Sequence, residues 1–177
     1  MLVKLGAREA AAQEPSLVGL LASCHEKIRA FSALAVSLAS RDDLGAEEVS
    51  DACSRCERYF ADALPLHVAD EDQSLRPRLA SASGAVGEAL EAMSAEHVEH
   101  RASLDALIEA LAAMREHGST PATRAALARV APAFERAMAE HLALEESRIF
   151  PAISRFLSAD EQAAIVVELR ARRTKAR

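Results

Sequence analysis

Two stretches of the sequence, HVADEDQSLRP (residues 67–77) and HLALEESRIFP (residues 141–151), share one pattern although their starts lie 74 residues apart. Each begins with His, has Glu four residues later with a second acid beside it, and reaches Pro at the eleventh position. Residues at i and i+4 lie on one face of an α-helix. Each stretch therefore predicts a helical turn that presents an imidazole and a carboxylate together, and each proline predicts a nearby helix end.

The composition favours helices throughout the chain. Half of the 177 residues are hydrophobic, but only six are aromatic, and Ala and Leu are abundant. A β-sandwich would need Val, Ile, Thr and aromatic residues in alternation, whereas Ala and Leu are strong helix formers. The length suits one domain with a substantial core.

Periodic apolar positions predict four long helices, at about residues 17–40, 46–77, 85–117 and 121–151. Pro65 should kink the second helix or start a new turn, and Thr120 with Pro121 should begin the fourth. The short connections favour an all-α, up-down-up-down four-helix bundle over residues 16–157, after a flexible segment at 1–15. A capping box at Ser158 and Glu161 predicts a short extra helix with a basic tail in residues 158–177, lying across one end of the bundle.

Five of the six histidines lie on the apolar stripes of these helices, and each helix contributes at least one. One inward histidine is usually a satisfied core residue, but several histidines and two glutamates in one core would be costly without a common partner. A dinuclear metal site provides such a partner, and nitrogen and oxygen donors suit non-haem iron, although Mn or Zn could occupy the same ligands. The candidate metal ligands are His25, His67, Glu71, His97, His100, His141 and Glu145.

Two histidines of this set, and the polar residues near it, have separate predicted roles. His97 and His100 are three residues apart and can both reach the centre; we expect His97 to be a ligand and His100 to be either a fifth histidine ligand or a neighbour lining an open metal position. Asp72 and Glu146 are turned by roughly 100° from the glutamates beside them, so they should be solvated or contact the ligands. His117, beside a glycine, suits the negative end of a helix dipole.

Four segments resemble the hemerythrin-like family, also called HHE cation-binding domains, in its bacterial branch. They are CHEKIRAF (24–31), HVADED…P (67–77), AEHVEH (95–100) and HLALEESRIFP (141–151), and the resemblance covers roughly residues 16–157. It implies a four-helix bundle with an oxo- or hydroxo-bridged pair of irons held by His25, His67, Glu71, His97, His141 and Glu145.

The same resemblance bears on function. Oxygen-carrying hemerythrins have His-x-x-x-His in the third helix and His-x-x-x-x-Asp in the fourth, whereas this chain has Arg101 four residues after His97, and Glu145 after His141. Two carboxylates, four histidines and a bridging oxygen would leave two of twelve iron positions open. We expect a protein that binds, senses or scavenges oxygen, nitric oxide or peroxide. A di-iron enzyme or iron donor in stress repair, and a metal-regulated interaction module, are the alternatives.

Other features exclude several classes of function. A net charge of −6 does not favour nucleic-acid binding, which needs a basic surface. No run of about 20 apolar residues predicts a membrane span, and the start of the sequence lacks the apolar core of a signal peptide, so we expect a cytoplasmic protein. Three cysteines do not suggest a disulfide framework, and Cys53 and Cys56 are best interpreted as small helix-packing residues. The oligomeric state is not predicted.

Overall fold

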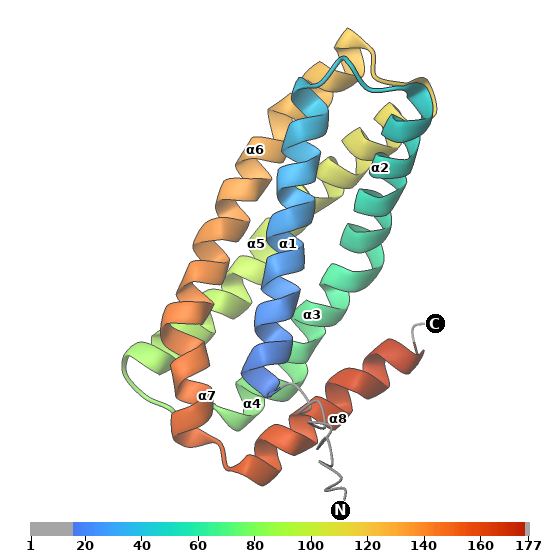
Figure 1. Cartoon of the computed structure of the whole chain (residues 1–177). Coiled ribbons are helices and arrows are strands. Elements are labelled where there is room, and N and C mark those ends of the chain that lie inside the picture. The colour runs from blue at the N-terminus through green and yellow to red at the C-terminus, as the bar shows by residue number, and fades with distance from the viewer. Residues whose placement is uncertain (1–15, 176–177) are drawn as a thin grey trace, which may run out of the picture.

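The computed structural model describes residues 16–175, which form an antiparallel four-helix bundle with one further helix across its end (Figure 1). The all-α prediction is confirmed. The flexible segment predicted at residues 1–15 and the last two residues of the basic tail lie outside the described range.

Each long helical segment begins where the sequence predicts. The first is α1 (Leu17–Ser40), whose N-cap Ser16 accepts a hydrogen bond from the Gly19 amide. The second consists of α2 (Ala46–Arg58), η1 (Tyr59–Ala63), α3 (Leu64–Asp70), η2 (Glu71–Leu75) and α4 (Arg76–Arg78). The third is α5 (Ala85–His117), which ends at Gly118 with a positive φ of 76°. The fourth consists of α6 (Pro121–Leu144), η3 (Glu145–Ile149) and α7 (Phe150–Phe156), and α8 (Ala159–Lys175) follows.

The segments labelled η are wide π turns, and each ends two residues before a proline: Pro65, Pro77 or Pro151. In each turn an amide donates to the carbonyl five residues earlier, namely Leu64 to Tyr59, Arg76 to Glu71 and Phe150 to Glu145. The extra residue accommodates a proline, which has no amide hydrogen and would clash in a regular turn. The prediction that the fourth helix ends by Pro151 is therefore wrong, because the helix continues to Phe156. The second helix does end near Pro77, at Arg78.

The core consists of two apolar clusters, one toward each end of the bundle. One cluster includes Phe60, Leu107 and Phe134, and the other includes Leu75 and Ile153. Along every long helix the candidate ligands lie between residues of the first cluster and residues of the second. Apolar packing at both ends thus holds the four helices in register around a polar centre.

Helix α8 crosses the end of the bundle where α1 begins, and it lies against α3 and η2 (Figure 1). Its Ile165 and Leu169 are buried in the second apolar cluster. Near its end, Arg172 and Arg173 each place a guanidinium nitrogen 2.7 Å from a carboxylate oxygen of Asp70, whose side chain is fully buried. The prediction of a helix across one end is confirmed, and the ion pairs tie this helix to the residue before Glu71. Within residues 16–175, no helix is long and apolar enough to cross a membrane.

Candidate metal centre

The structure brings six of the seven predicted ligands together in the middle of the bundle. They form two groups of four, each with ligand atoms within 4.8 Å of one another. The two groups share both glutamates but have different pairs of histidines. The first contains His25 and His67 with Glu71 and Glu145, and the second contains His97 and His141 with the same glutamates.

The two oxygens of each glutamate face different histidine pairs. In Glu71, Oε1 lies 3.3 Å from Nε2 of His67, and Oε2 lies 3.3 Å from Nε2 of His97. In Glu145, Oε2 lies 3.0 Å from Nε2 of His25, and Oε1 lies 3.0 Å from Nε2 of His141. Each carboxylate thus presents one oxygen to each pair of histidines.

The donor atoms fit bound metal better than they fit one another. Several buried donors have no hydrogen bond of normal geometry among the described residues, namely Nε2 of His25, His67 and His97, Oε2 of Glu71 and both carboxylate oxygens of Glu145. Ligands at about 2.1 Å from a metal and at right angles lie about 3.0 Å apart, which matches the closest nitrogen–oxygen distances. Such unsatisfied buried groups would be costly without a cation to bind them.

Opposite charges shift the pKa values of these groups when no metal is bound. Burial lowers the pKa of His25, but interactions with Glu145 and Glu71 outweigh it and raise the value to about 10. The same balance, with Glu145 as the main partner, raises the pKa of His141 to about 9. Burial raises the pKa of Glu71, but the charge of His67 and interactions with other histidines hold it below its usual value. In the absence of metal, protons therefore provide the positive charge that the carboxylates require.

Three of the four histidines have a carboxylate at the nitrogen that points away from the centre. Nδ1 of His25 lies 2.9 Å from Glu146, that of His97 lies 3.1 Å from Asp72, and that of His141 lies 2.7 Å from Glu96. Such carboxylates fix the orientation and tautomer of metal-binding histidines. Asp72 and Glu146 were expected either to be solvated or to contact the candidate ligands. The structure shows the second arrangement. Glu96, which directly precedes His97, is a further contact that was not predicted from the sequence.

A comparison with protein families agrees with this geometry. The model of the hemerythrin HHE cation-binding domain matches residues 16–164. The chain belongs to the hemerythrin family. No curated protein matches the sequence. The family resemblance predicted from four short motifs is thereby confirmed, and the His/Glu cluster supports metal binding by this hemerythrin.

In this member of the hemerythrin family, Glu71 and Glu145 are the first residues of the π turns η2 and η3. Wide turns of this kind occur often at functional sites. The acid that follows each glutamate contacts a histidine of another helix: Asp72 reaches His97 on α5, and Glu146 reaches His25 on α1. The repeated His-x-x-x-Glu-acid pattern followed by proline thus brings together an inward imidazole, an inward carboxylate, an outer carboxylate and the wide turn that carries them.

His100 belongs to neither group of four. Its ring is perpendicular to that of His141, with the centroids 5.5 Å apart, and its Nδ1 is buried without a hydrogen-bond partner among the described residues. Burial, together with the positive charge of His141, lowers the pKa of His100. The structure therefore places this histidine beside the centre, within reach of a molecule bound there.

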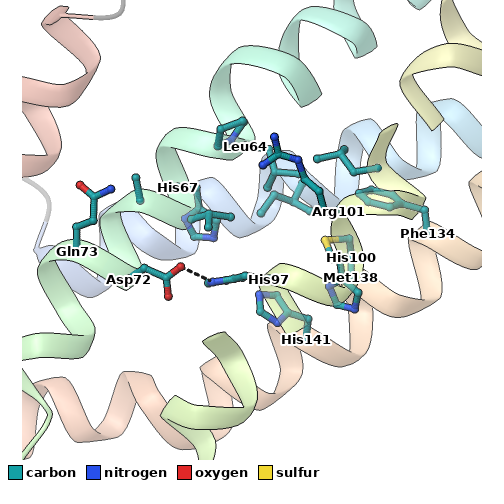
Figure 2. Close-up of a pocket in the computed structure, with 15 residues that line it drawn as sticks. Leu64, His67, Asp72, Gln73, His97, His100, Arg101, Phe134, Met138 and His141 are labelled. Carbon is teal, nitrogen blue, oxygen red and sulfur yellow. Dashed lines mark hydrogen bonds and ion pairs between the residues drawn. The ribbon is translucent and has the colours of Figure 1, made fainter. Parts of the chain in front are cut away.

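A cavity of about 260 Å³ adjoins the centre and is drawn in Figure 2. His67, His97 and His141 form its inner wall with His100, and Leu104, Phe134 and Met138 belong to its apolar lining. Arg101 also lines the cavity and has a side chain that is 76% exposed, so it lies where the cavity meets solvent. The cavity is large enough for a molecule of a few atoms and connects three candidate ligands with the exterior.

Proposed function

We propose that the chain is a non-haem di-iron protein that binds a small ligand, such as oxygen, nitric oxide or peroxide, in the cavity beside His97 and His141. The observation that supports this most strongly is the arrangement of Glu71 and Glu145, each with one oxygen toward each histidine pair. Four imidazoles and two carboxylates are a ligand set suited to iron. Two such ions would supply open coordination positions and electrons for a small oxygen or nitrogen species.

The outer carboxylates prepare the histidines for this role. Glu146, Asp72 and Glu96 each accept a hydrogen bond from the Nδ1–H of a histidine, so that Nε2 would be the nitrogen available to hold a metal. Each imidazole then presents an unprotonated Nε2 to the centre in a fixed orientation. The ligands are therefore held in place before a small molecule enters.

The cavity residues select the small molecule. Leu104, Phe134 and Met138 provide an apolar wall that disfavours bulk water, while His100 offers a hydrogen-bond donor near His141. Arg101, at the solvent side, carries a positive charge that attracts anions into the cavity. This combination suits a compact, polar or anionic ligand of two or three heavy atoms.

Optical spectra of the anaerobically reduced, iron-loaded protein test this function. We expect new visible absorption when oxygen, nitric oxide, peroxide or azide is added in about one equivalent per chain. Reaction that continues over many equivalents in the presence of a reductant would indicate a scavenging enzyme. Spectra that none of these molecules changes would contradict the proposal.

A further inference from the structure

The π turn η2, which carries Glu71, is joined to α8 by side chains on both flanks of that glutamate. The guanidinium of Arg172 spans the turn, because one of its nitrogens donates to the carboxylate of Asp70 at 2.7 Å and the other donates to the hydroxyl of Ser74 at 2.6 Å. Asp70 directly precedes Glu71, and Ser74 follows it by three residues. One side chain of α8 therefore connects the two sides of the turn.

Two further residues of α8 strengthen this connection. Glu168 accepts hydrogen bonds from the hydroxyl of Ser74 and from Arg78, which lies just after the turn. Arg173 places a nitrogen 2.7 Å from the second carboxylate oxygen of Asp70. Asp70 and Ser74 are almost completely buried, and a buried carboxylate is costly without charged partners. The contacts between α8 and η2 thus satisfy groups that water does not reach.

The turn of Glu145, η3, has a different sequence at the positions that contact α8 in η2. With the 74-residue offset between the two stretches, Leu144 corresponds to Asp70 and packs against the second apolar cluster. Arg148 corresponds to Ser74. The α8 residues that contact η2 also follow residue 164, where the match to the family model ends. The connection to α8 therefore distinguishes one glutamate of the centre from the other.

We propose that Arg172 is a positioning residue for the metal centre: by joining Asp70 to Ser74, it holds the wide turn in the conformation that directs Glu71 toward the histidines. The inference rests on the proposed metal centre. The two oxygens of Glu71 face one histidine of each pair, so a shift of this turn changes the geometry at both metal positions. π turns are uncommon conformations, and contacts from outside the helix help to keep the extra residue in place.

Hydrogen exchange of the metal-free, full-length protein compares the two turns within one molecule. Arg172→Gln removes the charge that Asp70 faces, so we expect the amides of residues 71–78 to exchange about tenfold faster or more than in the wild type. Residues 145–151 are the internal control and should exchange at the wild-type rate. Equal acceleration in both turns would show a merely general loss of stability and would overturn the proposal. Unchanged exchange in residues 71–78 would overturn it as well.

Release of zinc from the loaded protein to an excess of a coloured chelator tests the effect on the metal. Arg172→Gln should release zinc about tenfold faster or more than the wild type, because outer contacts of this kind change metal affinity by about 10–100-fold. Glu168→Gln, which weakens the contacts with Ser74, should act in the same direction. Arg172→Lys retains the charge but cannot span the turn, and it should release zinc at an intermediate rate. Arg76→Gln breaks an exposed pair with Glu91 in the same helical segment and is the control, with release unchanged.

The two experiments separate this inference from the proposed function. Wild-type protein that binds fewer than two zinc ions counts against the metal centre, while hydrogen exchange still decides whether α8 holds η2. Wild-type release rates in both Arg172→Gln and Glu168→Gln, with two zinc ions bound in each, overturn this inference alone. Circular dichroism checks that each variant is folded. The side chain of Glu168 is 40% exposed, so Glu168→Gln keeps the test decisive if Arg172→Gln does not fold.

Discussion

Metal binding at this centre should release protons, and the structure indicates how many. Without metal, His25 and His141 have pKa values of about 10 and about 9 because they face Glu145. Both are protonated at pH 7, yet a histidine must lose the proton on its metal-binding nitrogen. Binding of the proposed metal pair should therefore displace at least about two protons, and the raised pKa values of His67 and His97 act in the same direction.

The energetic consequence follows from the distance between these pKa values and the pH. At pH 7 the pKa of His25 lies about three units above the pH and that of His141 about two. Protons that compete with metal for these two nitrogens should therefore lower the apparent affinity for the metal pair by about five powers of ten, or ~7 kcal/mol of binding free energy. Near neutral pH the apparent affinity for the metal pair should rise about 100-fold for each unit of pH. The rise should end as the pH passes about 9 to 10.

Titration calorimetry in buffers of different ionisation enthalpy measures the protons released, and competition with a chelator at pH 6.5, 7.5 and 8.5 measures the affinity. Zinc serves as a redox-inert probe in both experiments. An affinity that does not change with pH, or release of less than one proton per chain, would refute the reasoning.

The same pKa values predict how the metal-free protein responds to pH. The folded-state pKa values of His25 and His141 lie above the unfolded value of about 6.5. The stability they contribute is therefore fully present below pH 6.5 and is lost as the pH rises through about 9 to 10. Urea denaturation of metal-free protein should show this loss, and higher stability at pH 10 than at pH 6.5 would contradict it.

Three further predictions concern individual parts of the structure. Removing the metal should lower the thermal midpoint, because buried carboxylates and imidazoles are left facing one another; identical midpoints with and without iron would show that the site is not linked to folding. His97→Ala should lose an iron, whereas His100→Ala should keep both and alter azide affinity; the reverse result would exchange the two roles. Asp70→Asn should destabilise the loaded protein in urea by about 1–3 kcal/mol, because it breaks the buried pairs with α8. Asp105→Asn, in an exposed pair, is the control and should change stability by less than about 0.5 kcal/mol.

The helices and the convergence of six candidate ligands could be predicted because both depend on spacing along a helix. The turn from His67 to Glu71 and the turn from His141 to Glu145 have their i, i+4 relation built into the sequence. Apolar residues flank each turn at helical intervals, so the inward direction could be inferred as well.

Features that depend on distant residues could not be predicted in this way. Glu96 is identified as the partner of His141 only when α5 and α6 are packed together, and Asp70 meets Arg172 and Arg173 only when α8 is in place. Pro151 was expected to end a helix because it lacks an amide hydrogen. A π turn accommodates it, and nothing local distinguishes that outcome from a helix end.

The number of metal ions per chain, measured in wild-type protein and in Glu145→Ala after anaerobic loading with iron, tests the dinuclear centre most directly. Glu145 faces His25 with one oxygen and His141 with the other, so its loss should weaken both positions. Glu140→Ala removes an exposed carboxylate from α6, in the same helical segment, and serves as the control. We predict two irons per chain in wild-type protein and in Glu140→Ala, and markedly fewer in Glu145→Ala. Fewer than two irons in the wild type, or two irons that persist in Glu145→Ala, would contradict the shared-carboxylate centre.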